Sequence, residues 1–244
     1  PMRRKITIRH LLEMRSGLDC DEWSDNGKDC ESEMEKSSNW VNYSLSLPMN
    51  SAPGKKWRYT SCNTMILSSI IAQASGISVM EFAKRYLFDP LGIIRYRWTV
   101  DPAGNGMTAG SFYIRPEDML KIGELVSNKG YWKGKALVSR KWIIESTASG
   151  IPIPDKHSFM QTSRSKVASP CQSYYGYSWY KEKIKTPKWQ YDAVFASGNG
   201  GQYIFIIKEL DLVVVFTQGN YGSWKAKQAF DILASYIIPV YRKN

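Results

Sequence analysis

The sequence contains no long hydrophobic run and only two histidines. No stretch approaches the roughly 18–20 apolar residues that a membrane-spanning helix needs, so we expect no membrane span. His10 and His157 lie far apart in the sequence and form neither a metal-ligand cluster nor part of a Ser-His-Asp triad. We therefore expect no metal site, a structural role for His10 and an exposed position for His157.

Cysteine is also scarce, with four residues in the chain. Cys20 and Cys30 bracket an acidic segment, and their spacing is compatible with a disulfide and equally with two free thiols. No further Cys or His pair lies nearby to complete a metal site. We expect Cys62 and Cys171 to be small buried residues without reactive thiols. Because a disulfide persists in an oxidising compartment, a periplasmic or secreted location is favoured over a cytoplasmic one.

Positive charge, in contrast, is plentiful, and the formal net charge is +11. Such a charge can accompany binding to nucleic acid or to an anionic envelope surface. The basic residues are nevertheless scattered, with the tightest cluster at Arg3–Lys5, and no nucleic-acid motif accompanies them. We favour a solvated basic surface and expect no nucleic-acid partner. Steeply salt-dependent binding to polyanions would favour the other interpretation.

Helical patterns dominate the first part of the chain. A capping box at Ser78 and Glu81 opens one helix, which we expect to end at Pro90. Gly76 is expected to end a second helix, because glycine readily adopts the left-handed conformation that stops a helix. Pro116 and the acidic residues after it are expected to begin a third. Besides the helix after Ser78, we predict helices at Thr7–Met14, 62–75, 116 to about 128, and Ser139–Thr147.

Strand patterns replace the helical ones after residue 172. The predicted strands are Tyr177–Lys181, Tyr191–Ala196, Tyr203–Lys208 and Leu212–Thr217, with a hairpin turn at 208–211 and a last helix at about 222–238. The last two strands are continuous apolar runs, typical of strands buried on both faces. The last helix can cover one face with Ala226, Ala229, Phe230, Leu233 and Ile237, so the sheet looks incomplete. We predict an α+β fold with a helical lobe at 1–171 and an antiparallel sheet with its helix at 172–244, together one structural unit.

Three segments of the chain carry recognisable motifs: Ile6–Leu18 (ITIRHLLEMRSGL), Pro53–Ser61 (PGKKWRYTS, continuing to FDPLGI at 88–93) and Ala196–Gln202 (ASGNGGQ). In this order they resemble the motifs of β-lactamase-related, penicillin-binding-protein-like serine hydrolases. The continuation Asp19–Trp23 is most similar to the branch that contains 6-aminohexanoate-dimer hydrolases and related esterases. The resemblance covers almost the whole chain. It implies a β-lactamase/transpeptidase-like fold, no cofactor, and hydrolysis of a small-molecule ester or amide through an acyl-enzyme.

The resemblance also implies roles for single residues. Tyr59 matches the tyrosine that shares proton transfer with a lysine, although a tyrosine that only packs is the alternative. Ser61 stands where many relatives have Asn; it could donate to substrate or serve as the N-cap of the following helix. Asn63 is a weaker candidate for the missing amide. The backbone N–H of Asn199 would stabilise the oxyanion.

The third motif differs from the Lys-Thr-Gly triplet of relatives. Ala196 removes the cation that would bind a β-lactam carboxylate, which favours neutral esters or amides. Ser197 keeps the hydroxyl, and Gly198, Gly200, Gly201 and Gln202 are predicted to contact substrate, with a bulged or bent strand as the alternative.

The nucleophilic Ser-x-x-Lys segment of the family lies upstream of the first motif, where only five residues precede Ile6. The single match within the chain, Ser163–Lys166, follows the tyrosine motif in a polar stretch and is interpreted as a chance occurrence. We therefore expect a fragment that is inactive alone and whose missing N-terminal segment would be its partner. The alternative is a non-catalytic relative with a binding or regulatory role.

Overall fold

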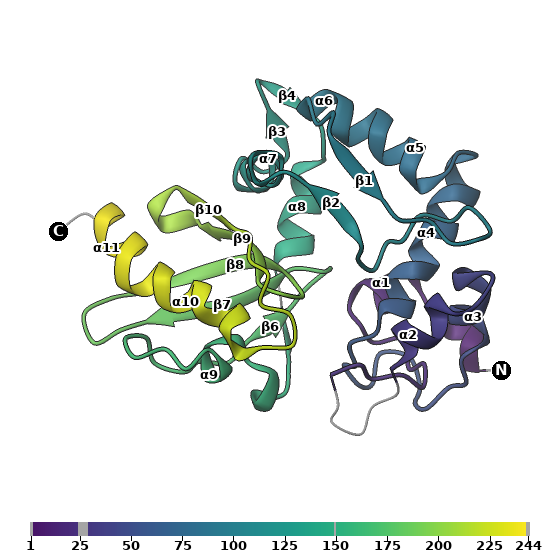
Figure 1. Cartoon of the computed structure of the whole chain (residues 1–244), viewed down its shortest axis with the longest axis horizontal. Helices are drawn as coiled ribbons and strands as arrows, with labels where there is room; N and C mark the ends of the chain where they lie inside the picture. Colours follow the sequence, from purple (N-terminus) through teal and green to yellow (C-terminus); the bar gives the residue numbers. More distant parts are fainter. Residues whose placement is uncertain (1, 24–28, 149, 243–244) are drawn as a thin grey trace. The chain divides into compact units, whose positions relative to one another are not determined.

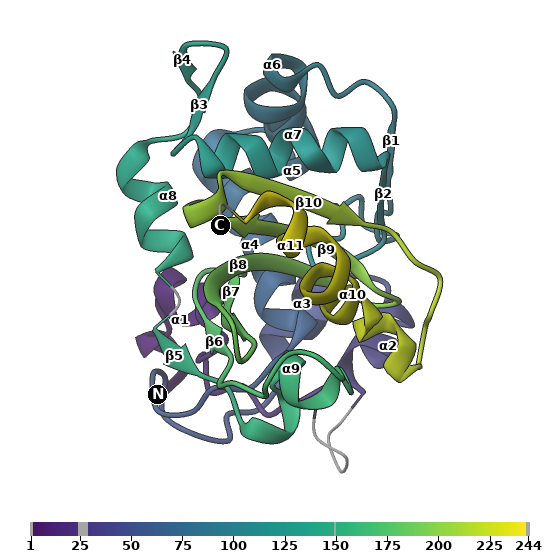
Figure 2. The same ribbon diagram turned by 90° about the vertical axis from the view of Figure 1, so that its left-hand side faces the viewer.

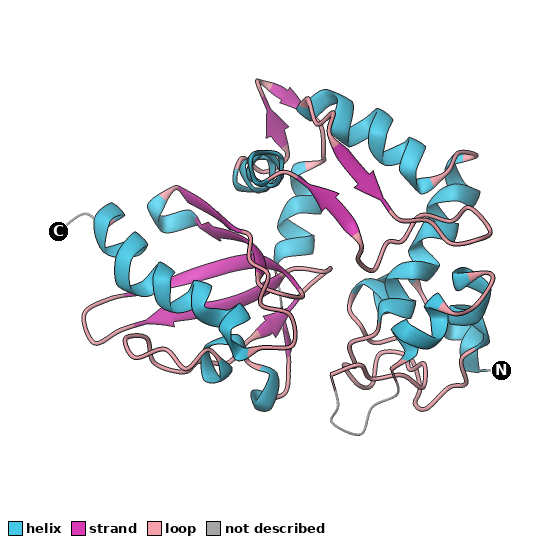
Figure 3. Ribbon diagram, viewed as in Figure 1, coloured by secondary structure: helices cyan, strands magenta, loops and turns pink. Residues whose placement is uncertain are grey.

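The computed structural model describes residues 2–23, 29–148 and 150–242, and the chain forms two compact units, Pro1–Ile114 and Arg115–Asn244 (Figure 1). Helices make up most of the first unit, whereas the second contains the large sheet (Figure 3). The predicted division after residue 171, drawn where helical patterns give way to strands, stays a prediction about organisation. The helices at 116–127 and 140–147 precede that division and belong to the second unit.

The first unit is built around a buried cluster between its N-terminal helices. The cluster includes Met34, Trp40, Cys62 and Met65. Its elements are α1 (Ile8–Leu12), α2 (Cys30–Glu35), α3 (Trp40–Ser46), α4 (Ser61–Ser75), α5 (Val79–Ala83), α6 (Asp89–Leu91), β1 (Tyr96–Trp98) and β2 (Phe112–Ile114). The helices predicted at 7–14 and 62–75 are confirmed as α1 and α4, and Gly76 ends α4 with a φ of 75°.

The helix that Ser78 opens does not end at Pro90, so that prediction was wrong. The Ser78 hydroxyl accepts from the Glu81 N–H as expected, but the chain continues through a π-helical turn at Lys84–Phe88 into α6 and ends at Gly92. Pro90 occupies the first turn of α6, where its missing N–H breaks no helical hydrogen bond. Among the described residues no single helix has the length and hydropathy for a membrane crossing; the pair 61–75 and 79–91 does so only jointly, with a 77° bend between them.

The second unit contains a six-stranded antiparallel sheet of order β10-β9-β8-β7-β6-β5. Its elements are α7 (Pro116–Ser127), β3 (Tyr131–Trp132), β4 (Lys135–Ala136), α8 (Arg140–Thr147), β5 (Ile151–Pro152), α9 (Phe159–Thr162), β6 (Tyr174–Tyr175), β7 (Tyr180–Lys185), β8 (Gln190–Gly198), β9 (Gln202–Ile207), β10 (Leu212–Phe216), α10 (Gln228–Ile232) and α11 (Ile238–Tyr241). The helices predicted from Pro116 and Ser139 are confirmed as α7 and α8, and the last three strands as β8, β9 and β10.

The first predicted strand, Tyr177–Lys181, was wrong at its start. Residues 176–179 form a turn between β6 and β7, closed by the Gly176 N–H to the Trp179 carbonyl at 2.8 Å. Ser178 adopts a left-handed φ of 62° in this turn. The aromatic residues of this segment are typical of a strand, but its backbone forms a tight turn, and composition alone did not reveal that.

Helices cover both faces of β9 and β10 (Figures 1 and 2). On one face, the Phe230 ring of α10 lies 5.0 Å from the Phe205 ring. On the other, α7 approaches so closely that a Cβ on Gly123 would lie 2.7 Å from Ile204 and 2.5 Å from Val213. The face expected to be uncovered is thus covered here by α7, a helix predicted from the sequence but not assigned to the sheet. β9 is buried on both faces as predicted, whereas β10, an edge strand, is half-buried beyond Leu212.

The last helix is not continuous as predicted. It begins with a 3₁₀ turn at Trp224–Lys227, and a π-helical turn at Leu233–Ile237 separates α10 from α11. The π-turn shifts the buried side by one residue, because its hydrogen bonds span five residues where those of an α-helix span four. Ile238 is consequently buried where Ile237 was expected, and Ile237 and Ala226 are only half-buried.

Candidate active site

Tyr59 lies on the loop that leads into α4, and its ring belongs to a small aromatic cluster. The Trp23 ring stacks on the Tyr59 ring with centroids 4.9 Å apart and planes 23° apart. Trp57 completes the cluster, 5.4 Å from Trp23 in an edge-on orientation. The Tyr59 side chain is half-buried. Its position before a helix was predicted; its stacking partner was not.

Glu22 binds the residues that follow Tyr59. Its N–H donates to the Tyr59 carbonyl at 3.0 Å. Its carboxylate accepts from the Ser61 N–H at 2.9 and 3.0 Å, from the Ser61 hydroxyl at 2.9 Å, and from the Thr60 hydroxyl at 3.3 Å. The Ser61 side chain is buried and its hydroxyl is engaged by Glu22. A substrate contact by Ser61 stays a prediction that would require this bond to break.

The N-cap of α4 is Thr60, so the prediction that Ser61 caps the helix was wrong. The Thr60 hydroxyl accepts from the Cys62 N–H at 3.2 Å, and Thr60 has an extended backbone with φ −151°. Ser61 is the first helical residue. Adjacent Thr and Ser are both good caps, and the choice between them depends on Glu22, which lies 39 residues away in sequence from Ser61.

The carboxylates around Tyr59 change its titration. Burial raises the pKa of Glu22 to about 7, because the hydrogen bonds from Ser61 only partly offset the loss of solvent. Burial also raises the pKa of Glu31, which lies near Glu22. The pKa of the Tyr59 phenol lies well above its usual range, through burial first and then through the charges of Glu22 and Glu31. The Tyr59 phenol is therefore neutral at pH 7 and is a weaker acid than a free tyrosine, and a cation beside it would strengthen it as an acid.

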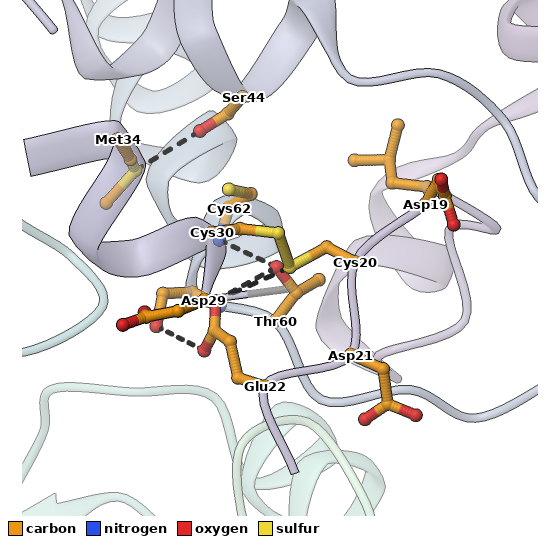
Figure 4. The surroundings of a disulfide bond; sticks show 12 residues. Asp19, Cys20, Asp21, Glu22, Asp29, Cys30, Met34, Ser44, Thr60 and Cys62 are labelled. Atoms are coloured by element: carbon orange, nitrogen blue, oxygen red, sulfur yellow. Dashed lines mark hydrogen bonds between the residues drawn. A yellow bond between two sulfur atoms is a disulfide. The ribbon is translucent and has the colours of Figure 1, made fainter. Parts of the chain in front are cut away.

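A disulfide anchors this segment (Figure 4). Cys20 and Cys30 are bonded, with their Cα atoms 6.2 Å apart, so the disulfide interpretation holds over two free thiols. Residues 24–28 of the intervening acidic segment lie outside the described residues. Cys62 is buried as predicted, and Cys171 is half-buried instead of buried. Burial raises the pKa of both free thiols, in keeping with unreactive cysteines.

Asn63 is fully buried inside the first unit. Its side-chain N–H donates to the Met14 sulfur at 3.5 Å, and its side-chain oxygen has no hydrogen-bond partner among the described residues. This burial favours a structural role. His10 is structural as predicted, since its Nδ1 accepts from the Thr7 N–H at the start of α1, and His157 is half-buried instead of exposed.

The third motif lies in the second unit, at the end of β8. Ser197 is half-buried and pairs across the sheet with Tyr203, whereas Gly198 and Asn199 are exposed. Burial raises the pKa of Tyr203 to about 12, opposed by a hydrogen bond with Ser197. The exposed position of Asn199 is compatible with the predicted oxyanion contact, which stays a prediction.

Gly200 and Gly201 adopt a left-handed backbone and pack closely against other residues of the chain. Their φ values are 83° and 97°. A Cβ on Gly200 would lie 2.7 Å from the Tyr221 ring, and one on Gly201 would lie 2.8 Å from the Ala226 carbonyl. This packing gives both glycines a structural role, and their predicted contact with substrate stays a prediction.

The Gln202 side chain fixes the same segment. Its Nε2 donates to the Gln218 carbonyl and its Oε1 accepts from the Gln218 N–H at 3.3 Å. Asn220 then donates to the Gln218 side chain at 2.8 Å, and its own N–H donates to the Gly200 carbonyl at 3.0 Å. Gln202 thus orders the loop beside the motif, and its predicted contact with substrate stays a prediction.

The Ser163–Lys166 match has the wrong geometry for catalysis. Ser163 is 1% exposed and its hydroxyl donates to the Met160 carbonyl. Arg164 has a left-handed φ of 56°, which ends α9, and the Lys166 side chain is exposed. A buried serine and an outward lysine on a turn cannot share a proton. Among the described residues, no group of three or more His, Cys, Asp and Glu side chains is placed to hold a metal ion.

Sequence reasoning missed Glu22 and Gln218 as organising residues. Glu22 was noted only as part of the Asp19–Trp23 segment, and nothing in its local spacing pairs it with Ser61. Gln218 lies two residues after the end of β10 and is followed by Gly219 and Asn220. A turn-forming sequence after a strand is the only local signal, and it does not reveal which residue the glutamine binds.

Comparison with known proteins identifies a family whose match covers almost the whole chain. The model of the Beta-lactamase family matches residues 1–236. The 6-aminohexanoate-dimer hydrolase of Paenarthrobacter ureafaciens is 28% identical over 96 residues, which are 39% of this chain and 24% of that protein.

Solved structures share the fold. A Bacillus anthracis protein assigned as a 6-aminohexanoate-dimer hydrolase has a TM-score of 0.73 at 15% identity, covering 97% of this chain and 61% of that one. The simvastatin synthase of Aspergillus terreus has a TM-score of 0.70 at 13% identity, covering 98% and 69%. The chain thus spans less than two thirds of the length of both hydrolases named above. These likenesses confirm the predicted α+β fold of the β-lactamase/transpeptidase type.

Proposed function

Because the chain belongs to the Beta-lactamase family, we propose that it carries the tyrosine motif and the third motif of a serine hydrolase that cleaves a small ester or amide through an acyl-enzyme. Two named similarities support this reaction class, since the sequence relative and one structural relative are 6-aminohexanoate-dimer hydrolases. The observation that carries the proposal is the fixed, half-buried phenol of Tyr59 at the entry to α4.

The chain's own groups would contribute proton transfer and charge stabilisation. Because its pKa is held above the usual range, the Tyr59 phenol is protonated at neutral pH and can donate a hydrogen bond to the leaving group. Transfer of its proton would require a cation beside it, such as the lysine of a Ser-x-x-Lys segment, to lower that pKa. The backbone N–H of Asn199, an exposed residue, would donate to a developing oxyanion, with Ser197 and Gly198 beside it as candidate substrate contacts. Ala196 in place of a cationic residue favours substrates without a carboxylate at that position.

The nucleophile would come from a Ser-x-x-Lys segment that these 244 residues do not supply in a usable geometry. We therefore expect no covalent adduct when the chain is incubated with p-nitrophenyl acetate and examined by intact-mass spectrometry. Adding a peptide or protein segment that carries the family's Ser-x-x-Lys helix should restore acylation. If the chain alone forms a stoichiometric acyl adduct, and Ser163→Ala no longer forms it, this assignment is overturned.

A binding or regulatory role is the second candidate. Two observations favour it: the Ser61 hydroxyl is already engaged by Glu22, and Ala196 stands where relatives have a cation. Saturable binding of ester or amide ligands without acylation, even with the Ser-x-x-Lys segment present, would support it over the hydrolase. The Cys20–Cys30 disulfide supports a periplasmic or secreted location for either function.

A further inference from the structure

The segment Cys20–Trp23 contacts the Tyr59–Ser61 segment through three different groups. The Glu22 backbone N–H binds the Tyr59 carbonyl at 3.0 Å. The Glu22 carboxylate binds the Ser61 N–H and hydroxyl. The Trp23 ring stacks on the Tyr59 ring. Backbone, carboxylate and ring therefore fix the same short stretch of chain from one side.

The carboxylate contact completes the start of α4. The first backbone N–H groups of a helix have no partner within the helix. Thr60 satisfies the Cys62 N–H, and Glu22 satisfies the Ser61 N–H. Ser61 is 3% exposed, so water cannot readily replace Glu22. Removing the carboxylate would leave two buried donors of Ser61 unpaired, which is costly.

The disulfide anchors the segment that carries Glu22 to the core of the first unit. Cys20 and Cys30 belong to the buried cluster of the first unit, and Glu22 follows Cys20 by two residues. Figure 4 shows Glu22 turned toward Thr60, whereas the neighbouring Asp21 points away from it. Asp21 instead accepts from the Trp23 N–H at 3.3 Å. Two adjacent acidic side chains thus have different surroundings, which supplies a matched control.

We propose that Glu22 is a positioning residue for Tyr59, holding the phenol in one orientation by binding the Tyr59 carbonyl and the first turn of α4. Its importance for catalysis rests on the proposed function of Tyr59. The positioning itself can be measured without turnover, so the two ideas fail separately. Glu22 touches no reacting atom in this proposal and acts only through Tyr59, Thr60 and Ser61.

The test compares Glu22→Ala, Glu22→Asp and Asp21→Ala in the full chain by NMR. We expect Glu22→Ala to speed amide hydrogen exchange at Ser61 by roughly tenfold, the equivalent of one lost hydrogen bond, and to weaken the cross-peaks between the Trp23 and Tyr59 rings. Glu22→Asp, which withdraws the carboxylate by one methylene, should give a smaller change in the same direction. Asp21→Ala should leave both signals near those of the parent chain.

Unchanged Ser61 exchange and unchanged ring cross-peaks in Glu22→Ala would overturn the proposal. If Glu22→Ala does not fold, unchanged signals in Glu22→Asp would overturn it in the same way. Equal effects of Asp21→Ala would also overturn it, because a general loss of acidic charge would then explain the result. Intact positioning together with no acylation in any reconstituted enzyme would instead count against the proposed function alone.

Discussion

Each unit of the molecule holds a glutamate against the start of a helix, Glu22 half-buried and Glu182 buried, and the two differ in their neighbours. Glu22 in the first unit accepts from the Ser61 N–H of α4. Glu182 in the second unit accepts from the Met160 N–H of α9 at 2.9 Å and from the Ser173 hydroxyl. Burial raises the pKa of both carboxyls to about 7. Similar pKa values therefore arise at two unrelated places in the fold.

The difference lies in the charge beside each carboxylate. Lys227 attracts Glu182 and opposes the rise in its pKa, and the Lys227 ammonium donates to the Thr162 hydroxyl of the same α9. Glu22 instead has Glu31 nearby, which adds to the rise, and the motif tyrosine next to it. A carboxylate enclosed with a cation ties elements together. A carboxylate beside another acid also changes the proton affinity of its neighbour.

The largest predicted effect concerns the pH dependence of stability through Glu182. Burial raises its pKa in the folded chain from the ordinary value of 4.5 to about 7, so the folded state binds more protons between pH 4.5 and 7. Stability from this group is fully present below pH 4.5 and is lost as the pH rises through 7. At 1.36 kcal/mol per pKa unit, the loss is roughly 3 kcal/mol.

Urea unfolding between pH 4.5 and 8 should show that Glu182→Gln loses most of this slope relative to the parent chain. Glu209→Gln, which neutralises an exposed glutamate of the same unit, should keep the slope. Parallel pH profiles for the parent chain and Glu182→Gln would refute the idea that this buried carboxyl titrates near neutrality.

Reduction of the disulfide should weaken the first unit and not the second. The bonded cysteines are separated by 10 residues, and a loop of that size corresponds to about 2–3 kcal/mol of lost stabilisation. Urea unfolding followed by NMR signals from each unit, with and without a thiol-free reductant, would measure the effect. A comparable loss in residues 115–244 would show that the reductant acts on something other than this bond.

Local signals predicted much of the fold, and contacts distant in sequence account for most of what was missed. The end of α4 at Gly76 and the turn at 208–211 follow from single residues with well-defined backbone preferences. The π-turns before α6 and α11 leave no such signal, because their residues suit an ordinary α-helix equally well. Because of the first π-turn, the helix continues past Pro90, where it was predicted to end. Because of the second, Ile238 is buried in place of Ile237.

The candidate site divides in the same way. Motif order was enough to nominate Tyr59 and the turn after β8, since these carry recognisable residue patterns. It could not show that Glu22 engages Ser61 or that Gln202 binds Gln218. Those pairings depend on which loops the fold brings together, and glutamate and glutamine are common enough that neither stands out in sequence.

The smallest predicted effects come from removing the charged neighbour of each buried glutamate. Glu31→Gln should lower the pKa of Glu22 toward its usual range, because a nearby like charge is lost. Lys227→Met should raise the pKa of Glu182, because an attractive charge is lost. Because Glu31 is half-exposed, Glu31→Gln should alter the unfolding free energy by under about 1 kcal/mol at neutral pH.

Carbon-13 NMR titration of the side-chain carboxyls would follow both glutamates in one experiment. The decisive result is the sign: opposite shifts in the two variants mean that neighbouring charge, added to a similar burial, distinguishes the two regions. Shifts of the same sign would mean that the substitutions act by changing solvent access. In that case Glu22 would differ from Glu182 in location only. The charges of Glu22 and Glu31 would then not explain the raised pKa of Tyr59.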